Sequence, residues 1–304
     1  MDVIKEREKS KLLIGLNYLD KRIKLGDPDK RYLLNLEKGF IGEELFDSVV
    51  KQYLKGEALV LNDLLIESKG TTFQIDSLVV TSDTVYLYEI KNYKGDFQMN
   101  SGQLYYISGQ EITNPLIQLN RTRELLRQLL KEWGSRLKIE ANVVFINDSF
   151  TLYNAKIEDP FIFPTQLKEH FKELSSRSKV IKKDHHYLAS KLVSVHKDDL
   201  PYQKQLPFYK LDDLIKGISC CYCGSVDLIV TQRSCYCKFC YKQMSIEDLV
   251  TESVKELKFL FPDQKVTTTL VDEWCGNSVN YRKIRKILQN DFMVSGTTSG
   301  TYYE

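Results

Sequence analysis

The chain has 304 residues, of which 42% are hydrophobic and 11% aromatic, and its 43 basic and 41 acidic residues give a formal net charge of +2. This length predicts about two domains, and the composition predicts that they are folded rather than disordered. The balance of charge excludes a uniformly basic nucleic-acid binder, although an average can hide local basic patches.

Membrane spans and signal peptides would each leave a recognisable apolar pattern in the sequence. No apolar run approaches the roughly 18–20 residues of a membrane span. Residues 1–11 alternate in charge and no apolar stretch follows them, which is unlike a secretory signal peptide. We therefore expect a cytoplasmic protein with no membrane partner. Six of the seven cysteines lie between positions 220 and 240, and in a reducing compartment such clustering favours metal binding over disulfides.

Composition and periodicity divide the chain into five segments. They are an N-terminal helical segment (1–36), a mixed α/β domain (37–197), a linker (198–216), a cysteine-rich segment (217–244) and a helical domain (245–304).

The α/β segment has a readable order of elements. Apolar spacing predicts helices over 39–54 and from Pro115 to about Trp133, the second with Asn114 as its cap. Runs rich in Val, Ile, Leu and Tyr predict strands at 58–66, 73–81, 84–91 and 141–146. The predicted order is helix, three strands, helix, strand.

The second and third strands carry the clearest chemical signal. If Ser82 and Asp83 form a two-residue turn, Asp76 faces Glu89, with Cβ atoms only about 4.5–5.5 Å apart. Lys91 lies on the same face because side chains alternate along a strand. A divalent cation such as Mg²⁺ would relieve the repulsion between the two carboxylates, and a lysine beside it would stabilise charge on phosphate. The alternative is a surface hairpin in which Lys91 simply neutralises one acid.

Four ordered motifs, together with this order of elements, resemble the NERD (nuclease-related) domain of the PD-(D/E)xK nuclease superfamily. The similarity covers roughly residues 37–146 and implies a restriction-endonuclease-like αβββαβ core. The residues that carry it are Gly39–Glu43, Gln74–Asp76, Glu89–Asn92 followed by Gly95, and Asn114–Gln118.

The resemblance implies metal-dependent hydrolysis of phosphodiester bonds, with DNA favoured over RNA. Asp76, Glu89 and the main-chain carbonyl of Ile90 match the ligands of a Mg²⁺ or Mn²⁺ ion, and Lys91 matches the catalytic lysine. Two further matches assist the metal, the water or the phosphate: Glu43, which the Gly-x-x-Gly-Glu pattern selects over Glu44, and Gln118 at the start of the second helix.

The cysteine-rich segment contains two Cys-x₂-Cys pairs, Cys220/Cys223 and Cys237/Cys240. Each pair can place two thiolates on one tight turn, and two such turns complete a tetrahedron around Zn²⁺ with no position left for water. The arrangement resembles a zinc ribbon with a structural zinc ion. Cys221 and Cys235 offer Cys-x-Cys alternatives; otherwise they are ordinary thiols, as is Cys275.

Basic and aromatic residues flank these cysteines, and they suit either a nucleic acid or a protein partner. The basic ones are Lys216, Arg233, Lys238 and Lys242, and the aromatic ones are Tyr222, Tyr236, Phe239 and Tyr241.

The last segment predicts helices at 246–259, 266–274 and 279–289, the third capped by Asn277 or Ser278, and then two short β-like pieces within 293–303. This order is similar to a winged helix–turn–helix, whose basic helix contacts phosphates. A small helical bundle with a solvated basic face is the alternative. The candidate nucleic-acid-binding residues on the third helix are Arg282, Lys283, Arg285 and Lys286.

Together these features favour a metal-dependent, nuclease-like protein that acts on DNA and is targeted by the zinc ribbon and the C-terminal helices. One alternative is a non-catalytic module on the same fold that binds nucleic acid or protein. Another is a transcriptional regulator in which the C-terminal tail carries the function.

Overall fold

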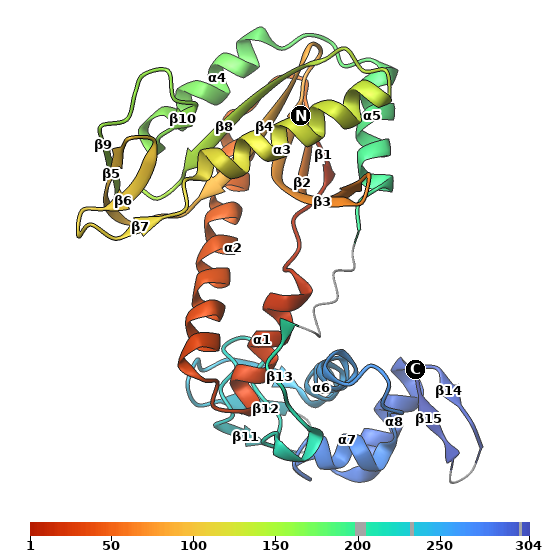
Figure 1. The fold of residues 1–304 in the computed structure, drawn as a ribbon. Coiled ribbons are helices and arrows are strands. Elements are labelled where there is room, and N and C mark those ends of the chain that lie inside the picture. Colours follow the sequence, from red (N-terminus) through yellow and green to blue (C-terminus); the bar gives the residue numbers. More distant parts are fainter. Residues whose placement is uncertain (198–204, 232–233, 298–299) are drawn as a thin grey trace. The chain divides into compact units, whose positions relative to one another are not determined.

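The computed structural model describes residues 1–197, 205–231, 234–297 and 300–304, and Figure 1 shows its elements. The chain forms two compact units. The first comprises Met1–Lys9 and Leu34–Leu200, and the second comprises Ser10–Leu33 and Pro201–Glu304. In the part of the chain that is described, no helix combines the length and the apolar character needed to cross a bilayer.

The first unit is built on a six-stranded mixed sheet. Its β3–β4 and β2–β3 pairs are antiparallel, while β1, β8 and β10 each pair in parallel with a neighbour. In spatial order the strands are β1 (Asp2–Lys5), β2 (Leu59–Ser68), β3 (Thr71–Val80), β4 (Thr84–Lys91), β8 (Lys138–Phe145) and β10 (Phe161–Ile162).

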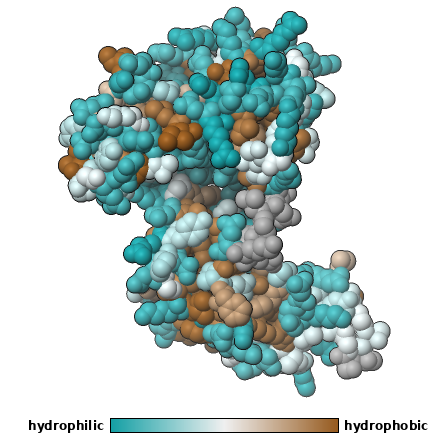
Figure 2. All heavy atoms as spheres, in the orientation of Figure 1, coloured by the Kyte–Doolittle hydropathy of each residue, from teal (hydrophilic) through white to brown (hydrophobic). Residues whose placement is uncertain are grey.

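Helices cover both faces of this sheet, so each face has its own apolar core. On one face Phe46 of α2 (Asp27–Tyr53) and Phe171 of α4 (Leu167–Arg177) pack against Val79 and Tyr88. On the other face α3 (Pro115–Glu132) and α5 (Lys183–Ser194) pack over Leu78 and its neighbours. With the apolar side chains buried, hydrophilic residues predominate on the surface of this unit in Figure 2.

A second, smaller sheet takes three strands from between β4 and α3 and a fourth from after β8. Its strand order is β7 (Glu111–Ile112), β6 (Gln103–Tyr106), β5 (Gly95–Asn100) and β9 (Phe150–Tyr153). Aromatic stacking joins it to the main sheet, since the rings of Phe150 and Phe145 lie 4.1 Å apart. A 3₁₀ turn, η1 (Pro164–Gln166), precedes α4.

The predicted αβββαβ core is confirmed as α2-β2-β3-β4-α3-β8. The predicted hairpin register is also correct, because Ser77 pairs with Tyr88 and Val80 with Val85. The helix predicted over 39–54 is longer than expected and begins at Asp27. Its start carries acidic residues and Pro28 in the first turn, which are usual N-terminal signals. The expectation of a wholly helical segment at 1–36 is wrong for residues 2–5, which form β1.

The second unit combines helices with two small sheets. A three-stranded sheet contains β11 (Leu228–Val230), β12 (Ser234–Cys237) and β13 (Gln243–Ser245), and a two-stranded one contains β14 (Val294–Ser295) and β15 (Tyr302–Tyr303). The helical elements are α1 (Lys11–Arg22), η3 (Leu211–Asp213), α6 (Ile246–Leu260), α7 (Thr268–Trp274) and α8 (Tyr281–Asp291).

Two boundary predictions need correction. The predicted linker at 198–216 begins with 198–204, outside the described residues, but Leu206 and Leu214 are 8% and 3% exposed. Residues 205–216 therefore pack into the second unit. The cap of α8 is Asn280, which accepts hydrogen bonds from the amides of Arg282 and Lys283, rather than Asn277 or Ser278.

A buried ion pair ties α1 to α6 in the second unit. Nη2 of Arg22 lies 2.5 Å from Oε2 of Glu256, and both side chains are at most 5% exposed. The same guanidinium donates to the carbonyls of Ile215 and Gly217, and it lies 4.1 Å from the centroid of the Trp274 ring. The guanidinium thus contacts a carboxylate, two carbonyl oxygens and an aromatic ring.

We predict that Arg22→Met destabilises the second unit by about 3–5 kcal/mol, because it leaves a carboxylate buried without a partner. Urea unfolding, followed by the fluorescence of Trp274 in a Trp133→Phe background, measures the change. Lys255→Met is the control, since it breaks an exposed α6 pair with Glu252 and such pairs contribute little. Equal unfolding midpoints for the two variants would contradict the assignment.

Candidate active site and cysteine cluster

The β3–β4 hairpin brings Asp76 and Glu89 together. They occupy the next positions along the register that pairs Ser77 with Tyr88, and they are only 7% and 3% exposed. Oδ2 of Asp76 accepts a hydrogen bond of 2.8 Å from the amide of Ile90. Two acidic side chains on adjacent strands are therefore held inside the protein rather than on a solvated hairpin.

Lys91 and Gln118 join this pair from the ends of β4 and α3. Nζ of Lys91 lies 2.6 Å from Oε1 of Glu89 and donates to Oε1 of Gln118 at 3.2 Å. This oxygen of Glu89 is buried, and its polar contact among the described residues is the ion pair with Lys91. Gln118 owes its position to the start of α3, where Asn114 caps the helix and Pro115 follows it.

Glu43 reaches the same place from α2. A Cβ atom on Gly42 would lie 2.5 Å from the Cβ of Asn92, so only glycine lets the helix approach the end of β4 this closely. The side chain of Asn92 donates to the carbonyl of Lys38 and fixes the same contact. Glu43 is the next residue after this contact, whereas the adjacent Glu44 is exposed to solvent.

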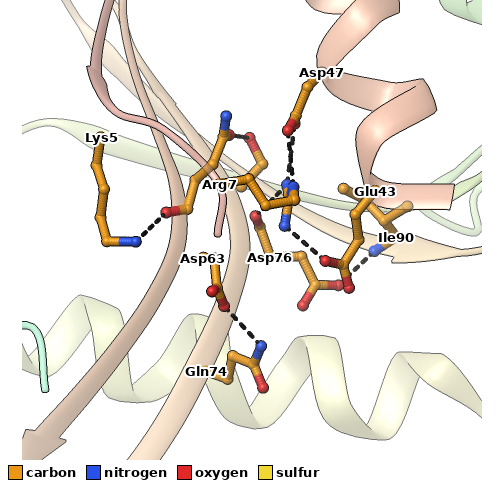
Figure 3. A network of polar contacts seen from close by, with 10 residues as sticks. Lys5, Arg7, Glu43, Asp47, Asp63, Gln74, Asp76 and Ile90 are labelled. Atoms are coloured by element: carbon orange, nitrogen blue, oxygen red, sulfur yellow. Dashed lines mark hydrogen bonds and ion pairs between the residues drawn. The ribbon is translucent and has the colours of Figure 1, made fainter. Parts of the chain in front are cut away.

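Arg7 is a residue that our sequence analysis missed. Its guanidinium donates to Oε2 of Glu43 at 2.8 Å, to both carboxylate oxygens of Asp47 at 2.8 and 3.0 Å, and to the carbonyl of Asp76 at 2.9 Å. Figure 3 shows this side chain between the two acids of α2. No local pattern marks it in the sequence, because all its partners are at least 36 residues away.

Asp63 is a further acid that the sequence did not single out. It lies on β2 opposite Asp76, between the pairs Asn62–Ser77 and Leu64–Ile75, and its φ of 51° is unusual for a residue other than glycine. Nε2 of Gln74 donates to its carboxylate at 3.0 Å. Its charge adds to those of Glu43 and Asp76.

Burial and mutual repulsion shift the pKa values of these acids. Burial raises the pKa of Glu89 to about 8 and that of Glu43 to about 7, and the charge of Asp76 contributes to both shifts. Burial also raises the pKa of Asp76, against the opposing influence of Lys91, the Ile90 amide and Arg7. Burial alone would lower the pKa of Lys91, but Glu89 and Asp76 outweigh it and the pKa is raised. The site therefore contains more acids than cations, and its acids bind protons more readily than ordinary carboxyl groups.

The chemistry of this donor set fits a hard divalent cation, which prefers carboxylate and carbonyl oxygens. Oε1 of Glu89, which pairs with the Lys91 ammonium, is a carboxylate oxygen of the kind that such a cation binds. The group is more open than a closed metal cage. Among the residues described, the four cysteines are the one set of three or more His, Cys, Asp or Glu side chains whose ligand atoms all lie within 4.8 Å of one another.

The cysteine set consists of Cys220, Cys223, Cys237 and Cys240. The Sγ atoms of Cys220 and Cys240 are 3.6 Å apart, as are those of Cys223 and Cys237. Four thiolates at Zn–S distances of about 2.3 Å in a tetrahedron would be about 3.8 Å apart. The cluster is thus compatible with a structural zinc ion and with the two Cys-x₂-Cys pairs, not with the Cys-x-Cys alternatives.

The backbone around these cysteines supports ligand thiolates. Gly224 and Tyr241, which directly follow the two pairs, both have positive φ angles of 74° and 60°. The amide of Cys240, together with that of Phe239, donates to Cys237 and lowers its pKa to about 6. Of the other thiols, Cys235 and Cys275 are buried and Cys221 is exposed.

Aromatic side chains stand out from this small sheet. Tyr222, Phe239 and Tyr241 are 58%, 74% and 72% exposed, and Nζ of Lys242 lies 4.1 Å from the centroid of the Tyr222 ring. Arg233, the fourth predicted basic neighbour, lies outside the described residues.

The basic residues of α8 divide into two groups. Arg282, Arg285 and Lys286 are exposed, and their spacing places them on one helical face. Lys283 is partly buried and lies 3.0 Å from Glu247. On the opposite side Ile284, Ile287 and Leu288 are buried, as predicted.

Comparison with known proteins identifies a domain family in the first unit. Residues 38–146 match the family model of the nuclease-related domain, so this part of the chain is a NERD domain. No curated protein matches the chain. Among solved structures, that of protein VC1899 from Vibrio cholerae matches at 16% identity over 54% of this chain, with a TM-score of 0.29. The chain spans half the length of that protein.

We predict that the purified protein contains about one zinc ion and that Cys240→Ser removes it, because three thiolates cannot close a structural site. Elemental analysis by mass spectrometry measures the metal. Thermal unfolding should show a less stable second unit in the variant, since the binding energy of such a zinc ion is folding energy. Cys221→Ser is the matched control and should keep its zinc. Equal zinc in both variants would refute the ligand set.

Proposed function

We propose that the NERD domain of this protein is a metal-dependent phosphodiester hydrolase that acts on DNA. The observation that carries the proposal is the convergence of Asp76, Glu89 and Lys91 in one buried cluster, with Gln118 bonded to that lysine. A solvated hairpin would leave these side chains exposed and unlinked.

Each residue has a distinct part in this proposal. Asp76, Glu89 and the carbonyl of Ile90 would hold Mg²⁺ or Mn²⁺, which when bound supplies a water of lowered pKa and neutralises the phosphate. The amide of Ile90 orients the Asp76 carboxylate. The ammonium of Lys91 stays charged and faces the acids, from where it can stabilise charge on a phosphate oxygen.

Glu43 and Gln118 complete the proposed constellation from the two flanking helices. Glu43 supplies a third carboxylate, whose pKa is raised to about 7 by burial and by Asp76. Such a group can accept a proton from water near neutral pH. The amide of Gln118 fixes the lysine and has donors left for a phosphate or a water.

Cleavage of plasmid and oligonucleotide DNA with Mg²⁺ or Mn²⁺ tests the proposal. We predict that Asp76→Asn and Lys91→Met each lower the rate by about a hundredfold or more, the usual cost of removing one charge-stabilising group. Asp83→Asn is the matched control, because it changes an exposed acid in the turn of the same hairpin and should cleave like wild type.

Equal cleavage by all four proteins would refute the site. Absence of cleavage of any DNA or RNA by wild type would favour the alternative, a binding module that keeps the fold without the reaction.

We also propose that α8 contacts the nucleic-acid backbone. This rests on the three exposed cations Arg282, Arg285 and Lys286 on one face, none of which forms an ion pair within 4.0 Å in the described part of the chain. The exposed aromatic and basic residues of the cysteine-rich sheet suit base stacking, although a protein partner would use the same side chains.

The salt dependence of DNA binding tests the role of α8. We predict that Arg282→Ala with Arg285→Ala weakens binding to different sequences equally and reduces the slope of log K against log salt by about two, one for each lost phosphate contact. Fluorescence anisotropy at several salt concentrations measures both. Arg177→Ala removes an exposed cation of α4 and is the control. An unchanged slope in the double variant would rule out α8 as the contact.

A further inference from the structure

We propose that Arg7 is a positioning residue of the candidate active site, which holds the carboxylate of Glu43 toward Asp76, and that the site is incomplete without the chain segment before the NERD match. This inference rests on the proposed function and adds to it a residue that lies 31 positions ahead of the matched range, which begins at residue 38.

The first argument is the geometry of the guanidinium. Arg7 uses Nε and both terminal nitrogens at once, on Asp47, Glu43 and the carbonyl of Asp76. Glu43 and Asp47 are four residues apart on α2 and therefore share a face of the helix. The contact thus fixes one face of α2 to the strand that carries Asp76.

The second argument is charge. Glu43 and Asp76 repel each other, and Asp63 adds to that repulsion. The side chain of Arg7 is 3% exposed, so water screens its charge little. Without it, Glu43 would be driven away from Asp76 toward solvent. Arg7 opposes this movement and keeps the acids close before any cation arrives.

The third argument is how the chain delivers Arg7. β1 adds to the edge of the main sheet by parallel pairing with β2, and its register shifts between Val3 and Lys5. On the same segment Nζ of Lys5 donates to the carbonyl of Asn62. This segment is therefore an integral strand of the first unit, and the two residues after it lead directly to the acids (Figure 3).

Manganese binding gives a test that does not require cleavage. Isothermal titration with Mn²⁺ is compared between wild type and variants, and the binding that Asp76→Asn abolishes defines the site. We predict that Arg7→Gln weakens this binding about 10–100-fold, the usual effect of losing a group that orients metal ligands. Arg7→Lys keeps the charge but not the fork of donors, and should recover part of the affinity.

A double-mutant cycle separates positioning from a general effect on the fold. If Arg7 acts through Glu43, Arg7→Gln should have little further effect in a Glu43→Gln background. Losses that multiply in the double variant would overturn the proposal, as would wild-type affinity in Arg7→Gln. Lys5→Met is the matched control, because it removes a bond from the same segment without touching the acids, and it should bind Mn²⁺ normally.

A variant that fails to fold would also lose Mn²⁺ binding, so folding is measured separately. Thermal unfolding identifies variants that do not fold. If Arg7→Gln is one of them, Asp47→Asn replaces it. Asp47 is 24% exposed, and this substitution weakens the ion pair that holds Arg7 on the side away from Asp76. A folded Asp47→Asn should show a smaller loss of affinity in the same direction, and an unchanged affinity overturns the proposal.

DNA cleavage by the same proteins distinguishes this inference from the proposed function. Mn²⁺ affinity that depends on Arg7 through Glu43, in a protein that cleaves nothing, supports the positioning role and refutes the hydrolase. Cleavage at equal rates by wild type and Arg7→Gln supports the hydrolase and refutes the positioning role.

Discussion

The cost of burying negative charge governs the first unit. Moving a carboxylate out of water costs several kcal/mol, yet Asp76 and Glu89 lie inside the protein and Glu43 lies beside them. Two cations, Lys91 and Arg7, face this group. The second unit offers a contrast, because there one buried acid, Glu256, meets one arginine. The other donors of that arginine bind two carbonyls, and its guanidinium lies over the Trp274 ring. A balanced pair stabilises the fold, whereas a cluster with more acids than cations has negative charge left for a further cation.

The fold places this cluster through three independent constraints. The two-residue turn fixes which residues of β3 and β4 face each other. Gly42 admits Asn92 and so brings α2 against the end of β4. The capped start of α3 delivers Gln118 to Lys91. Because each constraint acts on a different element, the constellation depends on tertiary packing as a whole, which explains why motifs separated by dozens of residues meet in space.

Sequence reasoning succeeded where the determining physics is local. A two-residue turn sets a register, Asn-Pro starts a helix, and paired Cys-x₂-Cys turns bring four thiolates together, so the pairing of β3 with β4, the start of α3 and the cysteine cluster were predictable. It failed where partners are distant. β1 becomes a strand only because the edge of β2 is free for it, and Arg7 has meaning only once α2 and β3 are packed. The start of α2 was missed for a different reason: Pro28 and its acidic neighbours are local signals, but the glycine motif at 39–43 suggested a helix start there.

The cysteine-rich sheet follows a different logic from the acidic cluster. Its strands have only three or four residues each, too few to build a core of their own, so cross-linking by four thiolates can replace apolar burial. Large rings such as Phe239 and Tyr241 then have nowhere to be buried and remain exposed. Where a metal supplies the stability, surface residues are free from packing, and aromatic and basic side chains remain exposed. In α8 as well, different residues serve packing and exposure: isoleucine and leucine side chains are buried against the unit, and arginine and lysine side chains face solvent. The second unit therefore exposes cationic side chains on α8 and aromatic side chains beside the cysteine cluster.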